Sequence, residues 1–586
     1  MNDNLIKSVK GGFAKHWRIL AVAAAAAVFF AAVSSYNFYA QEDGFVKWLS
    51  PDETANYAFA KLYAQTGQLS IFEKDNLAAG DIIHPRSVRS DGGYLKPVSF
   101  LGIIIFYGKI AQLTSYKVIP YLTPLFAAAG IIYYYLLVSR LFGKTNGLLS
   151  AMLLASFPVY LYYSARSMFH NVLFTVFLIV GLYYLLLMAK RWRPEKNYIG
   201  YLAAALAGAS LGGAAMARSS ELLWAAPALG LLWLFNLRKI HIAKLFLLAV
   251  FFLLAVYPGF YWNKRLYSSP YASGYPQMNQ SIAEIKTAGE MIVKTAVKID
   301  PPKPDMLRII KNNIFPFGVD YNNALNMFSA YFINMFSWIF WPALFGLVIF
   351  IRDADRWQKK HWAYISVFTL ASVFLVLYYG SWRFNDNPDP TRATIGNSYT
   401  RYWLFVYLGA FPFVALFISK LSAIVKMRKG ESAADYRWPW VYYLRRLLIP
   451  TARFAVIAAI CAMSVRFVVS GSEEGLITAY RRQLLAREEF KTVLAATEAD
   501  AAVITRYHDK VFFPERKVIV GIFDDDNMIR GYAALARVSP VYYYNFTLPE
   551  KDLAYLNKRR LVPFALELRP VKKVNGDFTL YRVERK

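Results

Sequence analysis

The sequence predicts a polytopic α-helical membrane protein with a small α/β domain at its C-terminal end. Of its 586 residues, 57% are hydrophobic and only 18% are charged, whereas soluble globular domains have roughly 45–50% and about 25%. The apolar residues fall in long runs with few charges, such as residues 21–39, 172–188 and 245–262. Each run approaches the ~20 residues that an α-helix needs to cross a bilayer.

About eleven membrane-spanning helices are expected from the ~17–25 residue window of a spanning helix. Their ranges are 18–39, 118–140, 146–163, 167–189, 199–216, 221–235, 244–262, 327–351, 362–379, 402–425 and 448–469. One further apolar stretch, residues 98–113, is short and contains Lys109, so we expect a juxtamembrane helix there. The first span starts too deep in the chain and lacks a clean cleavage site, which favours an anchor over a removed signal peptide.

Basic residues indicate the orientation of the spans, because they concentrate in every second connection. These connections are 140–144, 190–196, 238–244, 352–360 and 426–446. The positive-inside rule places them in the cytoplasm together with the N-terminus. We therefore predict a multi-pass protein of the plasma (inner) membrane. Its first outer loop would be residues 40–117, and residues 263–326 and 380–401 would also face outward.

The C-terminal segment, residues 470–586, then lies outside the membrane domain formed by residues 1–469. Short β-type runs at 502–505, 517–523 and 541–546 alternate with helical patterns. A hairpin is expected at 571–583, because Asn575-Gly576 is a strong turn signal between two such runs. The segment is therefore predicted to be a small extracytoplasmic α/β domain.

Composition also limits the partners and cofactors. The net charge is +29, but the basic residues lie between apolar runs, which fits membrane orientation and anionic lipid better than nucleic acid. Cys461 is the only cysteine, which excludes an intrachain disulfide, an iron–sulfur cluster and a cysteine-based zinc site. The six histidines are scattered, so no required cofactor is predicted, and a divalent cation has no support in the sequence.

The first outer loop contains Ser50-Pro51-Asp52-Glu53. One interpretation is purely structural: Ser50 caps a helix, Pro51 occupies its first turn, and Glu53 completes a capping box. The other interpretation is functional, with an outward carboxylate held at a rigid helix start. Because adjacent helical residues point about 100° apart, Asp52 and Glu53 cannot both address one atom. One of them would be the base, and its neighbour would position it or a ligand.

An acidic pair that opens a short helix after the first span resembles the GT-C glycosyltransferases, which include protein O-mannosyltransferases and the lipid A aminoarabinose transferase. Pro51-Asp52-Glu53, followed by Tyr57 and Gly67, fits their pattern. The resemblance implies inverting transfer of a sugar from a polyprenyl-phosphate donor to a protein, lipid or glycan acceptor on the outer side of the membrane. It makes Asp52 the expected general base, with Glu53 beside it in the catalytic region.

A second segment, Tyr94-Leu95-Lys96-Pro97, resembles the Tyr-x-x-Lys-Pro segment of the aminoarabinose transferase, one residue shorter. The resemblance implies that Lys96 lies near the donor phosphate. His84-Pro85 is a competing match to a variant of the same segment. The alternative for Lys96 is an interfacial lysine that reaches lipid headgroups.

The segment after the third span reads Ser164-Ala165-Arg166-Ser167-Met168-Phe169-His170-Asn171. GT-C relatives often carry a second acid four or five residues after the arginine, where this chain has His170 and Asn171. This departure argues against a metal bridged by two carboxylates. His170 remains a candidate proton acceptor or acceptor-orienting group, with a structural histidine as the alternative.

Several outward arginines are expected to bind the donor phosphate, because guanidinium forms charge-assisted, often bidentate hydrogen bonds with phosphate. Together with Lys96 they are Arg166, Arg218, Arg265, Arg383 and Arg401. Arg218 has an alternative partner in Glu221. The candidate contacts to sugar or acceptor are Tyr57, Tyr94, His170, Asn171, Tyr275 and Tyr399.

Two other functions remain open at this point. An enzyme like the O-antigen ligases would use outward arginines and a lipid-diphosphate oligosaccharide, and Arg392 would matter more than Asp52. A transporter or flippase of lipid-linked sugars would show repeat symmetry and broken helices near the membrane midplane, and neither pattern is evident. The sequence has no nucleotide-binding loop, which favours a lipid-linked donor.

Overall fold

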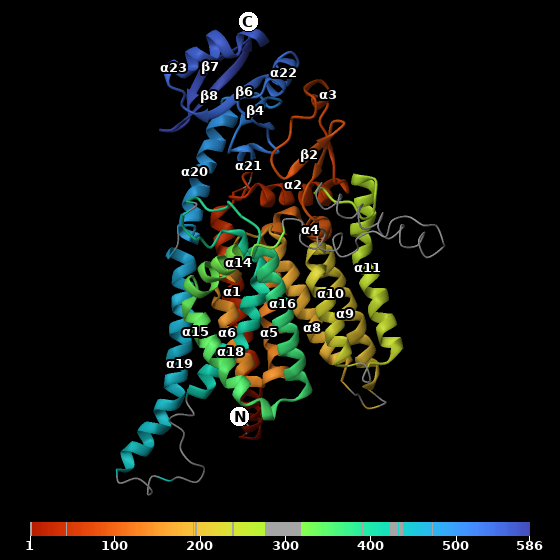
Figure 1. The fold of residues 1–586 in the computed structure, drawn as a ribbon, viewed down its shortest axis with the longest axis vertical. Helices are drawn as coiled ribbons and strands as arrows, with labels where there is room; N and C mark the ends of the chain where they lie inside the picture. Colours follow the sequence, from red (N-terminus) through yellow and green to blue (C-terminus); the bar gives the residue numbers. More distant parts are fainter. Residues whose placement is uncertain are drawn as a thin grey trace.

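The computed structural model describes residues 3–586 apart from 43, 191–192, 194–195, 237–239, 276–317, 390, 422–431, 433–437 and 472. A bundle of long helices carries a small mixed domain at one end (Figure 1). The N-terminus lies toward the other end of the bundle and the C-terminus lies in the domain. We call the end of the bundle that carries this domain the domain end. The predicted fold class is confirmed.

Every predicted span corresponds to helical structure. The helices are α1 (Asp3–Ala40), α5 (Ile119–Phe142), α6 (Lys144–Ser156), α7 (Pro158–Ala165), α8 (His170–Met188), α9 (Tyr198–Ala217), α10 (Leu222–Leu234), α11 (Ile242–Tyr267), α14 (Tyr321–Phe328), α15 (Ser337–Arg352), α16 (Lys359–Gly380), α18 (Leu404–Leu421) and α19 (Pro439–Ser470). Within the described residues, seven helices are long and apolar enough to cross a membrane, or up to nine if each of two bent pairs forms one span.

The two bent pairs differ from the straight spans that were predicted. Helices α6 and α7 meet at 49°, and the break precedes Pro158, which has no backbone N–H to continue the helix. The predicted span 327–351 is not one helix, because the chain turns by 99° between Tyr321–Asn334 and Ser337–Arg352. Helices α10 and α18 are also short for a full crossing.

Basic residues gather at the end of the bundle opposite the C-terminal domain. The Lys360 ammonium donates to the backbone carbonyl of Arg140 at 2.9 Å, and Lys420 pairs with Asp353 at 3.0 Å. These contacts join the connections after α5, α15 and α18. The basic connections that alternate along the sequence after α5, α15 and α18 therefore lie together at one end of the bundle.

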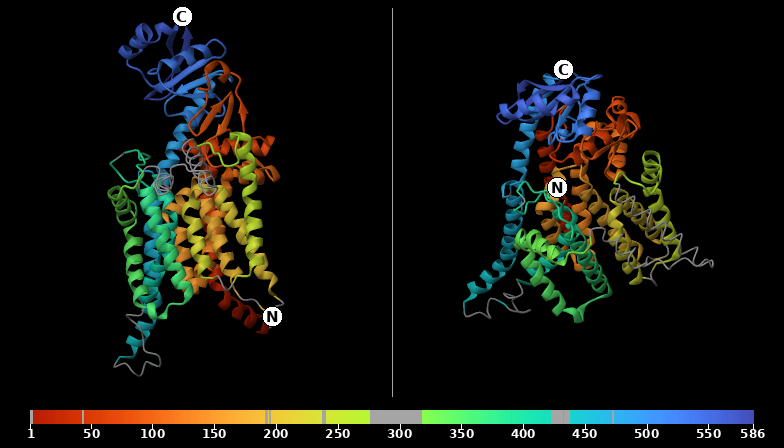
Figure 2. Two further views of the ribbon diagram at one scale, coloured as in Figure 1. Left: turned by 45° about the vertical axis from the view of Figure 1, so that its right-hand side comes forward. Right: turned by 45° about the horizontal axis from the view of Figure 1, so that its top comes forward.

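The first loop folds over the domain end of the bundle (Figure 2). It contains α2 (Pro51–Thr66), β1 (Ile71–Phe72), α3 (Asn76–Ala79), β2 (Val88–Asp91), β3 (Tyr94–Pro97) and α4 (Leu101–Leu113). The strands form an antiparallel sheet in the order β1-β3-β2. The helix expected at 98–113 is α4, whose 13 residues are too few for a span. It packs on α2, and Gly108 permits this close approach, since a Cβ there would lie 2.7 Å from the Tyr63 ring.

The C-terminal domain is a five-stranded mixed sheet in the order β5-β4-β6-β8-β7. Its strands are β4 (Ala502–Thr505), β5 (Lys517–Val520), β6 (Val541–Phe546), β7 (Leu566–Lys573) and β8 (Phe578–Arg585). Strand β4 is parallel to both neighbours, and β7 and β8 form the predicted hairpin. Its helices are α20 (Leu476–Ala495), α21 (Asp509–Phe512), α22 (Asp526–Leu535) and α23 (Glu550–Tyr555), and α20 follows α19 out of the bundle.

Several charged contacts join this domain to the first loop, among them those of Glu42 with Arg487 at 3.0 Å and with Lys491 at 3.3 Å. The buried Lys47 ammonium pairs with Glu515 at 2.6 Å. Lys517 pairs with Asp75 and lies 3.5 Å from Glu73. Arg86 pairs with Asp509. The first loop and the domain therefore form a connected layer above the bundle.

Within the bundle, α9 and α11 approach each other closely through two glycines. A Cβ at Gly208 would lie 2.1 Å from the Leu248 carbonyl oxygen, and one at Gly212 would lie 2.5 Å from that of Phe252. Glycines four residues apart bring helix backbones together in membranes, where dispersion contacts replace the hydrophobic effect.

Replacing Gly208 with a larger residue should push α9 and α11 apart. We expect Gly208→Ala to destabilise the protein by about 1–3 kcal/mol, the usual cost of overpacking, seen as a lower melting temperature in detergent. Gly230→Ala on α10 is the control, because nothing lies within 4 Å of its added Cβ. Equal melting temperatures for the two variants would contradict close packing at Gly208.

Candidate active site

Four helix ends bring buried polar side chains together at the domain end of the bundle. Arg166 follows α7, His170 begins α8, Arg218 follows α9, and Arg401 lies in the short helix α17 (Ser398–Tyr402). Three of these, all except Arg401, are less than 9% exposed. Buried charges this close to apolar helices require partners, so the partners determine what each group can do.

Glu53 is the partner of Arg166. Its carboxylate is fully buried, and its Oε2 accepts from Arg166 Nε at 3.0 Å and Nη2 at 2.6 Å. Arg166 Nη1 donates to the Tyr162 hydroxyl at 2.9 Å. The capping box of the structural interpretation is absent: Ser50 is the N-cap residue, but its side chain makes no cap hydrogen bond, and Glu53 pairs with Arg166 instead.

Asp52 points in a different direction from Glu53, as adjacent helical residues must. It is partly exposed, and its Oδ1 accepts a hydrogen bond from the Ser87 hydroxyl. Its negative charge acts on Tyr275 and on Arg401. The two acids of the pair therefore have separate surroundings: Glu53 pairs with Arg166 of the bundle, and Asp52 bonds to Ser87 of the first loop.

Arg401 carries a positive charge that no carboxylate pairs with directly within the described chain. Its Nη2 donates to the Ser398 hydroxyl at 2.6 Å, and its guanidinium lies 4.5 Å from the centre of the Phe169 ring. Burial opposes this charge, but the hydroxyls of Tyr402 and Tyr163 and the carboxylates of Asp386 and Asp52 raise the pKa of Arg401 above its ordinary value. Arg401 is therefore a persistent cation beside Asp52.

Arg218 has its charge compensated, as the alternative interpretation of the sequence expected. Its Nε donates to Glu221 Oε1 at 3.0 Å, and its Nη2 lies 2.9 Å from the same oxygen. The guanidinium also lies 4.7 Å from the centre of the Tyr402 ring. Arg218 contributes less net charge to the site than Arg401 does.

His170 and Tyr275 lie on either side of Phe100. The Phe100 ring centre is 5.9 Å from that of His170 and 5.5 Å from that of Tyr275. His170 Nε2 lies 3.2 Å from the Asn56 amide nitrogen, whereas its buried Nδ1 has no hydrogen-bond partner in the described structure. Asn171 joins α8 to Arg401 by donating to its backbone carbonyl at 3.3 Å. The cluster thus contains eight predicted residues: Asp52, Glu53, Arg166, His170, Asn171, Arg218, Tyr275 and Arg401.

The other predicted cations have partners elsewhere. Lys96 on β3 pairs with Asp91 at 2.9 Å. The exposed Arg265 lies beside Tyr261, and Arg383, whose side chain is 79% exposed, pairs with Asp320 at 3.5 Å. No contact described here joins these three cations to Asp52.

The remaining predicted aromatic residues pack against other rings. Tyr57 is buried against Trp48, and Tyr94 lies against Phe72 on the sheet of the first loop. Tyr399 is buried among aromatic rings that include Trp403.

Three polar residues near the site had no signal in the sequence. Ser87 contacts Asp52 from an irregular turn, and Asn56 holds His170 from within α2. Lys510 comes from α21 in the C-terminal domain, where the charges of Arg166 and Glu53 act on it. These contacts join segments far apart in the chain, so no local pattern could have revealed them.

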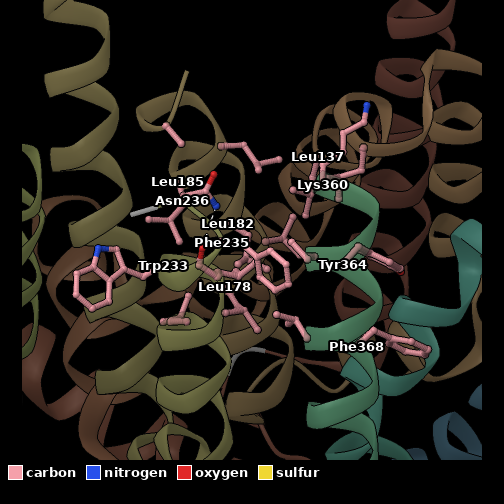
Figure 3. Close-up of a pocket in the computed structure, with 18 of the residues that line it drawn as sticks. Leu137, Leu178, Leu182, Leu185, Trp233, Phe235, Asn236, Lys360, Tyr364 and Phe368 are labelled. Atoms are coloured by element: carbon pink, nitrogen blue, oxygen red, sulfur yellow. Dashed lines mark hydrogen bonds between the residues drawn. The ribbon is translucent and has the colours of Figure 1, made fainter. Parts of the chain in front are cut away.

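An apolar cavity of about 480 Å³ lies below this cluster, between α8–α10 and α16–α18. Figure 3 shows Leu178, Leu182 and Phe235 on one side and Tyr364 on the other. The cavity lining extends from Thr175, one helical turn below Asn171, to the basic end of the bundle, where these residues line it: Lys190, Asn236, Lys359 and Lys360. Phe405, one turn after Arg401, also lines it. We call this cavity the apolar groove.

Residues 101–262, which run from α4 to α11, match the family model of dolichyl-phosphate-mannose-protein mannosyltransferases. None of the curated proteins matches the sequence.

The chain also resembles solved structures at low sequence identity. The archaeal oligosaccharyltransferase AglB from Archaeoglobus fulgidus, in complex with an inhibitory peptide and a dolichol-phosphate, is 12% identical, with a TM-score of 0.52 over 93% of this chain and 70% of that one. ArnT from Cupriavidus metallidurans, bound to undecaprenyl phosphate, is 12% identical, with a TM-score of 0.50 over 95% of this chain and 97% of that one. The fold is that of the GT-C glycosyltransferases. In this GT-C fold, the polar cluster lies where the first loop meets the bundle.

Lys510 of the C-terminal domain gives the stability of the folded protein a pH dependence. Burial lowers the pKa of Lys510 to about 8, and Arg86 and Arg166 act in the same direction, whereas Asp509 and Glu53 oppose them. The unfolded chain keeps the ordinary lysine pKa near 10.4. Between these two values the unfolded state binds more protons, so the stability contributed at this position rises with pH.

We therefore expect Lys510→Met to stabilise the protein most below pH 8, where the folded state must hold a charged lysine. The difference in melting temperature between Lys510→Met and the wild type should shrink between pH 8 and about pH 10. Lys551→Met on the exposed surface of the same domain is the control and should show no such trend. A difference that stays constant from pH 7 to about pH 10 would exclude the lowered pKa.

Proposed function

We propose that the protein transfers a sugar from a polyprenyl-phosphate donor to an acceptor hydroxyl at the outer face of the membrane. One observation carries the proposal: the charge of Asp52 acts on Arg401, a cation that pairs with no described carboxylate, and the apolar groove begins at Phe405, one helical turn after Arg401. The family match over residues 101–262 supports this chemistry. So does the binding of undecaprenyl phosphate by ArnT and of dolichol-phosphate by AglB, which share the fold.

Asp52 would act as the general base. Ser87 donates to Oδ1, and no other described group bonds to Oδ2, which leaves this oxygen for the acceptor hydroxyl. As Asp52 takes the proton, the acceptor oxygen attacks the anomeric carbon, and the bond from that carbon to the phosphate oxygen breaks. The products are the glycosylated acceptor and the polyprenyl phosphate, and the sugar inverts its configuration. A positioned base contributes typically 10²–10⁴ in rate.

Arg401 would stabilise the negative charge that develops on the departing phosphate. It is the strongest candidate among the arginines because Glu53 compensates Arg166 and Glu221 compensates Arg218. We infer that these two buried pairs hold the site in shape and that Arg401 binds the donor. The described residues contain no group of three His, Cys, Asp or Glu side chains that could hold a metal ion. We propose the Arg401 guanidinium for this role because guanidinium forms charge-assisted hydrogen bonds with phosphate.

The apolar groove would hold the polyprenyl chain. Its lining is almost entirely aliphatic and aromatic, and its upper rim lies one turn below Asn171 and Arg401. A lipid phosphate at Arg401 would therefore place its isoprene units in the groove. The basic connections lie at the opposite end of the bundle, and the positive-inside rule therefore supports our proposal that the site faces the outer leaflet.

Removing the base should abolish most transfer. We expect Asp52→Asn to lower sugar transfer by about 10²–10⁴, measured on the purified protein with a radiolabelled polyprenyl-phosphate sugar. Asp389→Asn is the control, because it changes an exposed carboxylate in the loop before α17. Wild-type transfer by Asp52→Asn would remove Asp52 from the mechanism. Movement of the labelled lipid without transfer would instead identify a flippase.

Filling the groove should discriminate between donors by chain length. We expect Leu178→Trp to raise the KM for a long-chain donor by about tenfold or more, equivalent to about 1.4 kcal/mol of lost binding, and to change the KM for a geranyl-phosphate sugar much less. Leu254→Trp is the control, since Leu254 is 61% exposed on α11 and does not line the groove. Equal effects on both donors would place the lipid chain elsewhere.

A further inference from the structure

Arg86 is the residue of the first loop that the C-terminal domain binds most completely. The Asp509 carboxylate is fully buried and accepts from the Arg86 backbone N–H at 2.9 Å, from Nε at 3.1 Å and from Nη2 at 2.5 Å. Arg86 Nη2 also donates to the Tyr507 carbonyl at 3.2 Å. Both the backbone and the side chain of Arg86 are therefore held by a segment 423 residues away.

Ser87 follows directly and has an unusual backbone conformation. Its φ is +64°, in the left-handed region that non-glycine residues rarely adopt. The hydrogen bonds on both sides hold it there: those of Arg86 to Asp509, and the bond from the Val98 N–H to the Ser87 carbonyl at 3.1 Å. In this conformation the Ser87 hydroxyl donates to Asp52. A backbone held in an unfavourable conformation commonly serves to aim a functional group.

Two other ion pairs between the domain and the first loop lack this connection. Lys47 and Glu515 join the domain to the chain before α2, and Lys517 and Asp75 join it to the start of α3. No bond described for these four residues continues to Asp52. They hold the domain in place, and they provide a matched comparison for the Arg86–Asp509 pair.

We propose that the C-terminal domain positions Asp52 through the segment Arg86–Ser87, with Asp509 and Ser87 as positioning residues. This inference rests on the proposed function, in which Asp52 is the base. Asp509 holds Arg86, the held backbone keeps Ser87 at positive φ, and the Ser87 hydroxyl fixes the rotamer of Asp52. The soluble domain thereby completes the site at the membrane surface without touching the substrate. Loss of any link leaves the carboxylate free to rotate away from the acceptor hydroxyl.

The test compares Ser87→Ala and Asp509→Asn with Asp75→Asn, which weakens another contact of the same domain. We expect the first two variants to lower kcat by about 10–100-fold, the range expected for a misplaced catalytic group, and to leave the KM of the donor unchanged. Asp75→Asn should keep kcat within about twofold, because no described bond of Asp75 continues to Asp52 and sites without shared partners act independently. Ser87→Gly, which adopts a positive φ readily but lacks the hydroxyl, should lose as much activity as Ser87→Ala. Rates are compared at equal amounts of folded protein.

A double-variant cycle separates positioning from damage to the fold. In the Asp52→Asn background, Ser87→Ala should cause no further loss, because the group that Ser87 positions is gone. Additive losses would overturn the proposal, and so would wild-type kcat in both Ser87→Ala and Asp509→Asn while Asp52→Asn is inactive. Full activity of Asp52→Asn itself would instead refute the proposed function.

Discussion

The buried ion pair of Glu53 and Arg166 is the contact on which the site depends. Removing two charges from water is costly, and the attraction between them compensates only if both remain together. Glu53 belongs to the first loop and Arg166 to the bundle, so the pair ties α2 to the helix ends beneath it. Breaking the pair would leave one charge buried alone. The start of α2, and with it the direction of Asp52, is therefore set by an interaction that takes no part in the proposed chemistry.

The pair of Glu53 and Arg166 is one of the contacts that hold the protein in a layered arrangement. The bundle supplies the cations and the apolar groove, the first loop supplies the carboxylate, and the C-terminal domain holds the loop from above through Lys47, Arg86 and Lys517. In this layered arrangement Asp52 is the only acid of the pair that remains partly exposed. The protein thus separates the structural acid from the proposed catalytic acid, although they are neighbours in the sequence.

Much of the fold could be predicted because hydropathy and turn signals are local. The helix positions, the short helix α4 and the β7–β8 hairpin follow from such signals. The 99° turn before α15 does not, because an apolar run has the same composition whether it is straight or bent. Within the site, the alternation of the predicted spans was enough to predict that Arg166, Arg218 and Arg401 lie at the same end of the bundle.

Local signals could not tell which loop cations turn inward. Lys96 and Arg383 have nearby acids in the folded chain that were not evident as partners, namely Asp91 and Asp320. Conversely, the contact of Arg86 with Asp509 spans 423 residues, and no spacing rule reaches that far.

That separation has a consequence for the order in which the protein is made. The first loop leaves the ribosome early. Its residues Lys47, Arg86 and Asp75 bind Glu515, Asp509 and Lys517, which all come after residue 508. At about 5–20 residues per second, synthesis of the intervening chain takes roughly 20–85 s. During this interval the first loop lacks the contacts that Glu515, Asp509 and Lys517 make with it in the folded protein. The first loop therefore reaches its fully bonded state only after the segment that follows residue 508 has been made and folded.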